Sequence, residues 1–411
     1  MQPRLSLGAE IAGSNSRTAS RIGSVDALRG IVMILMALDH VRDFFHRGAM
    51  TFSPTDLSKT TPLLFLTRWI THFCLPVFMF TAGTGAFLWW KRRDRTLSEL
   101  ARFLWTRGIW FVLLELTVMQ LAYNFNFSAS NLILLLILWI FGLCMLAMAA
   151  LVRLPLRSIA VFGLAIVAGH NLLDRFRASQ FGSGAWAWML LHQPGILKLG
   201  SHAALVTYTV LPWIGVMALG FCFGEVLLRP PDERRRLMQR IGSALIAAFF
   251  IIRIINRYGD PAPWSSQNSP VFTLLSFLNC TKYPASLDFL LMTIGPALIA
   301  LAWLDRHPLS IGNPLTVFGR VPFFYFVLHF YLIHLLAVLA AWLRYGSKAF
   351  GFMFQPLPSM GGPAQLFPSP FGYELWVAYV VWLFVVVSLY PVCRWYAAVK
   401  ARRRDWWLSY L

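Results

Sequence analysis

Long apolar runs recur along the whole sequence, and each is close to the roughly 20 residues that an α-helix needs to cross a bilayer. A backbone inside lipid must satisfy its own hydrogen bonds, which an α-helix does within a single segment. We therefore predict an all-α, polytopic integral membrane helical bundle with about ten transmembrane helices. The predicted spans lie near residues 28–45, 68–90, 103–122, 131–152, 157–174, 204–227, 241–256, 284–303, 316–342 and 374–393.

The composition is far from that of a soluble domain. The chain is 58% hydrophobic and 13% charged, whereas soluble domains are about 45–50% apolar and about 25% charged. The net charge of +19 could suggest a nucleic-acid partner. However, the Lys and Arg residues lie in short loops between apolar runs, where they set the orientation of a membrane protein. We therefore expect no nucleic-acid partner.

Basic residues mark one side of the predicted bundle. They cluster in the N-terminal tail, in the loops after spans two, four and six, and after the last span. These residues are Arg4, Arg17, Arg21, Lys91, Arg92, Arg93, Arg95, Arg153, Arg157, Arg229, Arg234, Arg235, Arg236, Arg240, Arg394, Lys400, Arg402, Arg403 and Arg404. With ten spans they all lie on one face, which the positive-inside rule makes cytoplasmic. We therefore expect both termini in the cytoplasm.

This pattern divides the chain into three parts. Residues 1–26 form a polar cytoplasmic tail, 27–397 a transmembrane domain, and 398–411 a basic and aromatic cytoplasmic tail. The first part lacks an apolar stretch followed by a cleavage site, so we expect no signal peptide.

The first span contains unusually many ionisable residues, which inside a membrane usually face the bundle interior. Arg29 and His40 are eleven residues apart, which places them within about 20° of one helix face and roughly 16 Å apart. Asp39 and Asp43 form an i, i+4 pair that Arg42 or an arginine of another helix can neutralise. The alternative is a pair of interface anchors and a histidine with ordinary core partners.

Spans two and three add further polar groups. Arg68 and His72 are spaced i, i+4 at the outer end of span two, before Pro76. Glu115 lies in the outer half of span three and needs a partner or a proton at that depth, for which Arg68 and Arg42 are candidates. A structural ion pair and a catalytic role are both open for Glu115.

The remaining polar groups gather towards the outer side. Asn171 and Asp174 end span five, Asn279 and Lys282 precede span eight, and His329 lies near the middle of span nine. By contrast, Arg29, Arg107 and Arg320 lie at the cytoplasmic ends of spans one, three and nine. That arrangement suits an anionic cytosolic ligand such as a phosphate-bearing cofactor, although the same arginines could reach lipid phosphates instead.

Several familiar chemistries lack their motifs. The sequence contains no G-x-S-x-G, H-E-x-x-H, Walker A or G-x-G-x-x-G pattern. Histidine spacings on the outer side do not repeat and the five cysteines fall in or beside apolar runs, so we expect no metal.

Five segments resemble the catalytic domain of the heparan-alpha-glucosaminide N-acetyltransferase family and its bacterial relatives of unknown function. They are residues 24–30 (SVDALRG), 72–78 (HFCLPVF), Arg107-Gly108, 276–284 (SFLNCTKYP) and Gly319-Arg320-x-Pro322. The Arg29-x10-His40 spacing is also similar to that of the acyltransferase-3 proteins. The resemblance covers most of the chain.

The resemblance implies an enzyme that takes an acetyl group from cytosolic acetyl-CoA and delivers it to an amine or hydroxyl of an extracytoplasmic glycan or amino sugar. It places a histidine after the first catalytic-domain helix, where His40, His46 and His72 compete. Histidine suits the base because its pKa lies near neutral. We hypothesise that Arg29 and Arg320 help to hold the CoA phosphates, that His40 is the base and that Asp43 supports it.

The candidate residues form three groups. The catalytic candidates are His40, Asp43, His46, His72, Glu115 and His329. The cofactor-binding candidates are Arg29, Arg107 and Arg320. The acceptor-binding candidates are Asp39, Arg68, Asn171, Asp174, Asn279 and Lys282.

A bacterial cytoplasmic (inner) membrane is the expected location. The expected partners are the lipid bilayer, a small-molecule or glycan acceptor, and a second copy of the chain as a homodimer. The alternative function is a transporter or proton-coupled permease that uses the same buried charges, and a non-catalytic scaffold or sensor is a third. The enzyme hypothesis requires Arg29, His40, Glu115 and His329 to converge on one interior chamber.

Overall fold

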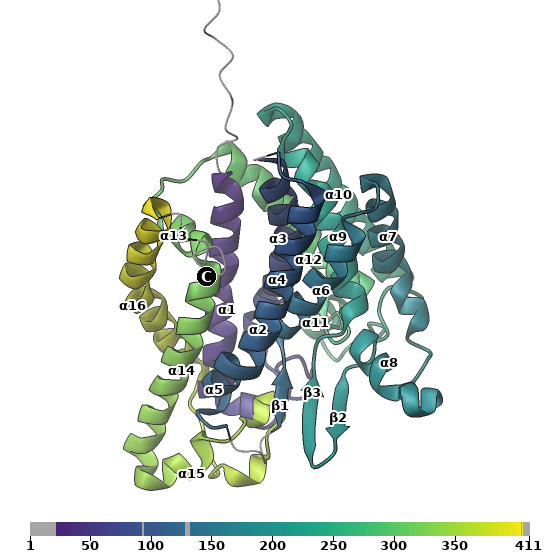
Figure 1. The fold of residues 1–411 in the computed structure, drawn as a ribbon. Coiled ribbons are helices and arrows are strands. Elements are labelled where there is room, and N and C mark those ends of the chain that lie inside the picture. Colours follow the sequence, from purple (N-terminus) through teal and green to yellow (C-terminus); the bar gives the residue numbers. More distant parts are fainter. Residues whose placement is uncertain (1–21, 93, 128–131, 404, 406–411) are drawn as a thin grey trace, which may run out of the picture.

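The computed structural model describes residues 22–92, 94–127, 132–403 and 405. The chain forms a helical bundle with a small sheet at one end (Figure 1). The helix α1 (Gly23–Phe45) runs through the middle of this bundle. It packs against α3 (Cys74–Lys91), α12 (Leu287–Arg306), α13 (Pro314–Arg320), α14 (Pro322–Tyr345) and α16 (Leu375–Arg402). The fold therefore brings the two ends of the chain together along one helix.

The other helices surround this centre. They are α2 (Pro62–Ile70), α4 (Leu97–Leu114), α5 (Gln120–Asn124), α6 (Ile137–Leu151), α7 (Leu156–Gly169), α8 (Ala185–Leu191), α9 (Val210–Leu227), α10 (Pro231–Ile255), α11 (Pro270–Leu278) and α15 (Ala349–Met353). The pairs α3–α9, α10–α12 and α4–α6 pack closely. The start of α1 and α13 lie at the upper end in Figure 1, and the sheet and α15 lie at the lower end.

Seven helical segments of the described chain are long and apolar enough to cross a membrane. They comprise α2 with α3, α7, α9, α10, α12, α14 and α16, and α6 is a shorter apolar helix. The charges of α1 and α4 keep these two helices out of that set. A multi-pass helical membrane protein is thereby confirmed, while the count of ten spans and the cytoplasmic termini stay predictions.

The three-stranded sheet is a departure from the predicted all-α fold. Its order is β1-β3-β2, with β1 (Ile133–Leu135) parallel to β3 (His202–Val206) and β3 antiparallel to β2 (Gly195–Leu199). The spans predicted to start at residues 131 and 204 therefore begin later, as α6 and α9. Short apolar runs such as 133–135 fit a strand and a buried helix equally well, so periodicity alone could not separate them.

The predicted span 316–342 is also wrong as one helix. It breaks at Val321, which has φ −130° and ψ 47° and separates α13 from α14. The next residue is Pro322, whose ring disfavours a helical conformation in the residue before it. The break leaves Arg320 at the last position of α13, where it can point away from the axis of α14.

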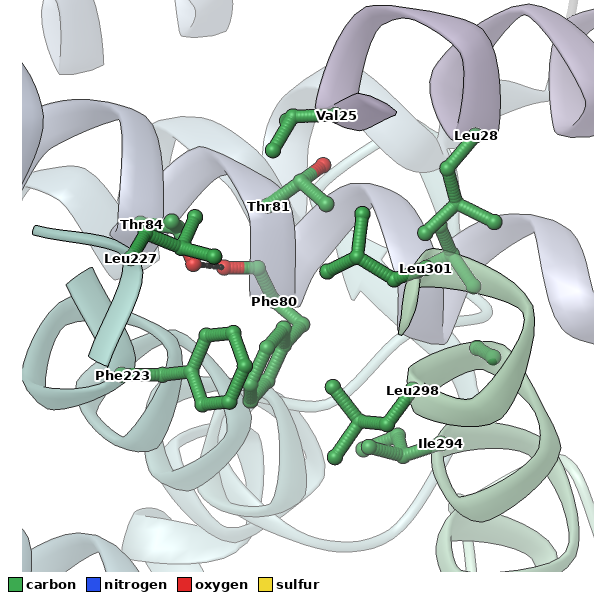
Figure 2. Close-up of a pocket in the computed structure, with 12 residues that line it drawn as sticks. Val25, Leu28, Phe80, Thr81, Thr84, Phe223, Leu227, Ile294, Leu298 and Leu301 are labelled. Carbon is green, nitrogen blue, oxygen red and sulfur yellow. Dashed lines mark hydrogen bonds between the residues drawn. The ribbon is translucent and has the colours of Figure 1, made fainter. Parts of the chain in front are cut away.

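The interface between α1, α3, α9 and α12 is a closely packed apolar core (Figure 2). Its one small void measures about 10 Å³, roughly the space of a single water probe. Thr84 keeps its hydroxyl satisfied there by donating to the carbonyl of Phe80 at 3.0 Å. This core therefore fixes α1 against its neighbours and leaves no room for a ligand.

The contact between α1 and α13 depends on two glycines. A Cβ atom on Gly319 would lie 1.6 Å from the carbonyl oxygen of Asp26, and one on Gly30 would lie 1.8 Å from that of Leu315. These distances are shorter than any van der Waals contact, so a side chain at either position would force the helices apart.

We expect Gly319→Ala to lower the melting temperature of the purified protein in detergent, because overpacking of this kind costs about 1–3 kcal/mol or more. Gly312→Ala is the matched control, since a Cβ there meets nothing within 4 Å. Equal melting temperatures for the two variants would contradict the close α1–α13 packing.

Candidate functional site

Two chambers penetrate the bundle. The apolar chamber has a volume of about 440 Å³ and is lined largely by apolar side chains of α1, α3, α4, α6 and α14, together with Arg29, Arg107, Arg320 and Lys400. The polar chamber has a volume of about 920 Å³ and is lined by Asp39, His40, Arg42, Asp43, Arg68, His72 and residues of several loops. The apolar chamber therefore combines a hydrophobic lining with four cations, and the polar chamber contains most of the other hydrogen-bonding groups.

The chambers lie on either side of a wall made by α1 and α14. On α1, Met36 lines the apolar chamber, and His40, about one turn further on, lines the polar chamber. On α14, Phe326 and Phe330 divide in the same way. The ring of His40 lies 6.3 Å from that of Phe326 and 4.0 Å from that of Phe330. His40 therefore stands at the boundary between the two chambers.

His40 is held by a second histidine. Its Nδ1 lies 2.7 Å from Nε2 of His329, and Nδ1 of His329 lies 3.0 Å from the carbonyl oxygen of Tyr325. A carbonyl oxygen can only accept, so His329 carries its proton on Nδ1 and its Nε2 accepts from His40. That assignment leaves Nε2 of neutral His40 with a free lone pair. Nε2 of His40 is therefore able to accept a proton, and the side chain that contacts its Nδ1 is His329 rather than Asp43.

The acids near His40 are engaged by arginines. Arg42 lies 3.0 Å from Asp39 and 2.7 Å from Asp43, and Arg68 forms a further ion pair with Asp39. Arg68 also donates to the hydroxyl of Tyr283 at 3.3 Å. Asp39 and Asp43 therefore hold the guanidinium groups of Arg42 and Arg68 in the chamber wall.

Glu115 lies apart from both chambers. Its carboxylate accepts from the backbone N–H groups of Leu138 and Trp139, at 2.7 and 3.1 Å, and from the hydroxyl of Tyr123 at 3.0 Å. It thus caps the start of α6, where unpaired N–H groups and the helix dipole favour an anion. The expected partners Arg68 and Arg42 are wrong. The predicted meeting of Arg29, His40, Glu115 and His329 in one chamber is also wrong, because Arg29 and His40 line different chambers and Glu115 lines neither, while His329 contacts His40.

The other histidine candidates lie at different places. His72 lines the polar chamber. His46 follows the end of α1, bridges to Tyr373 through its backbone, and does not line either chamber. Burial lowers the pKa of His46, and the nearby Arg42 guanidinium lowers it further.

Asn171 and Asp174 also lie outside the polar chamber. Asn171 donates to Asp174 and accepts from the backbone N–H of Leu287, and Asp174 lies 2.8 Å from Nε2 of His192. These groups fix the start of α12 against the end of α7, so acceptor binding by Asn171 and Asp174 has no support in the geometry. Asn279 and Lys282, by contrast, line the polar chamber.

The loop that carries Asn279 and Lys282 is braced by two residues that the sequence did not single out. Arg253 is buried and donates to the carbonyl groups of Ala262, Ser276, Phe277 and Asn279. Asp260 accepts from the N–H and hydroxyl of Thr281 and from the hydroxyl of Ser286. An arginine within the apolar run of predicted span seven is nevertheless a sequence signal of a buried role.

The cations of the apolar chamber come from separate helices. Arg29 of α1 donates to the hydroxyl of Thr81 at 3.1 Å, and Arg107 of α4 lies over the ring of Phe103 at 5.0 Å. Arg320 ends α13 and Lys400 is near the end of α16. All three predicted arginines therefore meet at one cavity, and Lys400 joins them. Among the described residues, no group of three or more His, Cys, Asp or Glu side chains could hold a metal ion.

Comparison with known proteins decides the family. The family described as "Heparan-alpha-glucosaminide N-acetyltransferase, catalytic" matches residues 21–254, which is more than half of the 411 residues. The chain belongs to this family. No curated protein matches it. Membership confirms the resemblance predicted from the sequence and indicates membrane acetyltransferase activity in general, with acetyl-CoA as the donor that the family uses.

The family match ends within α10, before much of the site. His40, Arg68, His72 and Arg107 lie inside the matched region, whereas Lys282, Arg320 and His329 lie beyond it. Each chamber is therefore completed by helices from the unmatched part of this acetyltransferase-family chain.

We expect Arg253→Met to lower the melting temperature strongly. It would leave several buried carbonyl groups unpaired, each of which costs about 1–3 kcal/mol. Arg257→Met removes the same charge from an exposed position and serves as the control. Thermal unfolding in detergent measures both, and a melting temperature of Arg253→Met close to that of the control would contradict the bracing role.

Proposed function

We propose that the protein transfers an acetyl group from acetyl-CoA in the apolar chamber to an acceptor in the polar chamber, across a bacterial cytoplasmic membrane. The observation that carries the proposal is the position of His40, a histidine held with a free Nε2 lone pair at the boundary between a cation-bearing chamber and a hydrogen-bonding chamber. The acceptor that we favour is an extracytoplasmic glycan or a related small molecule.

The orientation follows from the basic residues. The start of α1, the helix α13 and the end of α16 lie towards the upper end of the bundle in Figure 1, and these segments carry Arg29, Arg320 and Lys400. The loops richest in Lys and Arg leave the helices at the same end. The positive-inside rule places this end in the cytoplasm. The apolar chamber would then open towards cytosolic acetyl-CoA, and the polar chamber towards the opposite side.

The apolar chamber suits the donor chemically. Arginine and lysine bind phosphate oxygens, while the apolar lining accommodates an uncharged arm. Acetyl-CoA supplies a thioester, whose carbonyl carbon is open to attack by a nucleophile. The chain's contribution is to hold the phosphates near Arg29, Arg107, Arg320 and Lys400 and to keep the boundary near His40 apolar.

The histidine pair supplies the base. Nε2 of His40 can take the proton of the attacking hydroxyl or amine, and the resulting imidazolium keeps its hydrogen bond to Nε2 of His329. His329 itself is fixed by the carbonyl of Tyr325. In this arrangement His40 is the catalytic residue and His329 is the positioning residue.

We expect His40→Ala to reduce acetyl transfer by about 100-fold or more, since a positioned general base contributes about 10²–10⁴-fold. The measurement is CoA release from acetyl-CoA by purified protein in liposomes, with binding of acetyl-CoA as the test of folding. His307→Ala, at an exposed position near the end of α12, is the control. Activity of His40→Ala near the wild-type value would remove His40 from the role.

We expect Arg320→Met to raise the KM for acetyl-CoA by about tenfold, because a charge-assisted contact to phosphate contributes about 1.5–3 kcal/mol. The effect should vanish with acetyl-pantetheine, which lacks the phosphates. Arg306→Met removes an exposed charge that does not line the apolar chamber and serves as the control. An equal loss with both donors would mean that Arg320 does not bind phosphate.

A further inference from the structure

The polar chamber has an unequal balance of charge. Its lining contains the two carboxylates of Asp39 and Asp43 and the three cations of Arg42, Arg68 and Lys282. The two arginines are committed to the two carboxylates. The chamber therefore carries one positive charge more than it neutralises, and that charge belongs to Lys282.

Lys282 lies in the braced loop before α12. Among the described residues, no carboxylate forms an ion pair with its ammonium group. The nearest acid in the sequence is Asp288, which lies 3.7 Å from Arg253. Asp260 accepts from Thr281 and Ser286 at 2.6 to 2.7 Å, and neither acid lines the chamber. The fold thus holds Lys282 in place through its neighbours without neutralising it.

Other groups of the chamber also lack a partner. The buried Nε of Arg42 and the buried Nδ1 of His72 have no hydrogen-bond partner among the described residues, and the two side chains are 2% and 3% exposed. An unpaired buried polar group is costly, so such groups are expected to meet a ligand. A guanidinium N–H can only donate, which calls for an acceptor atom such as an oxygen.

The electrostatics of the loop agree with this. Burial by itself raises the pKa of the Tyr283 phenol, but Lys282 and Arg68 outweigh that effect and lower its pKa below the ordinary value. Tyr283 also lines the chamber. The region around Lys282 therefore favours a negative charge.

We propose that Lys282 is the anion-recognition residue of the polar chamber, and that the acceptor is an anionic hydroxyl compound such as a sugar acid rather than a cationic amino sugar. This inference rests on the proposed function. An ammonium group on the acceptor would meet no free carboxylate in the chamber and would be repelled by Lys282. A carboxylate or another oxyanion would pair with Lys282 and leave a nearby hydroxyl for the reaction.

The corresponding transfer is balanced. The acceptor oxygen bonds to the acetyl carbon while its proton passes to Nε2 of His40, and the carbon–sulfur bond breaks to release a thiolate. His40 then returns the proton to the thiolate, so the products are an O-acetyl ester and CoA. No further reactant is needed.

Four probes that differ in charge test the proposal. Glucuronate is anionic, its methyl ester and glucose are neutral, and glucosamine is cationic. Dissociation constants are measured by calorimetry with the full chain in nanodiscs, and CoA release from acetyl-CoA is measured with the same probes. We expect glucuronate to bind about tenfold more tightly than its methyl ester, and glucosamine to bind least.

Two variants, each of which removes one lysine charge, test whether the preference for glucuronate depends on Lys282. Lys282→Met should abolish the preference for glucuronate over its ester while leaving glucose binding unchanged. Lys198→Met, which removes an exposed lysine of β2 outside the chamber, should keep the preference. A preference that persists in Lys282→Met, glucosamine binding as tight as glucuronate binding, or no glucuronate binding would each overturn the proposal.

The same experiments distinguish a failure of the anionic-acceptor proposal from a failure of the proposed acetyltransferase function. Acetylation of glucosamine that depends on His40 would overturn the anionic acceptor and leave the acetyltransferase intact. A Lys282-dependent preference for glucuronate without CoA release from any probe would support the anion site and count against acetyl transfer.

Discussion

The helix α1 carries two arginines and two aspartates between Arg29 and Asp43, yet it lies in the middle of an apolar bundle. A helix with these charges is not stable against lipid, because each charge at that depth is costly. It is stable here because other helices surround it and because Arg42 and Arg68 neutralise Asp39 and Asp43. The need to enclose α1 explains why helices from both ends of the chain pack against it, with backbone contacts as close as those at Gly30 and Gly319.

The same constraint gives other buried charges a structural use. Glu115 and Arg253 are both nearly inaccessible, and each satisfies backbone groups that side-chain packing alone would leave unpaired. Glu115 holds the start of α6 beside β1, and Arg253 holds the loop before α12. Glu115 and Arg253 therefore position elements that line the chambers, although neither residue lines a chamber itself. A charge buried in such a bundle can thus be essential to a site that it does not line.

A buried charge can serve the structure or the chemistry, and the sequence alone does not distinguish these two roles. Spacing on one helix placed Arg29 and His40 on a common side, and both line chambers that meet at α1. The three arginines predicted for the cofactor also converge. Spacing could not show that His329 reaches His40, because those residues are 289 positions apart. It could not separate Glu115 from the catalytic candidates either, since a cap and a base look alike until their partners are known.

The fold, like the site, was predicted only in part from the sequence. Hydropathy identified most of the helices, because length and composition report directly on burial in lipid. It missed the strands, whose pairing joins residues 133–135 to 204–206 across the chain. It also ran α13 and α14 together, although Pro322 within span nine was a local signal for the break between them.

The wall between the chambers bears on how the proposed reaction avoids water. A thioester exposed to a wet polar chamber beside a free histidine base would be open to hydrolysis. Met36 and Phe326 face the apolar chamber, and the ring of Phe330, which lines the polar chamber, packs against that of His40. These apolar side chains surround the His40 imidazole at a place where the two chambers approach each other. Excluding water at that point also strengthens every electrostatic interaction of the histidine pair. The apolar wall is therefore as much a part of the proposed chemistry as the base that it surrounds.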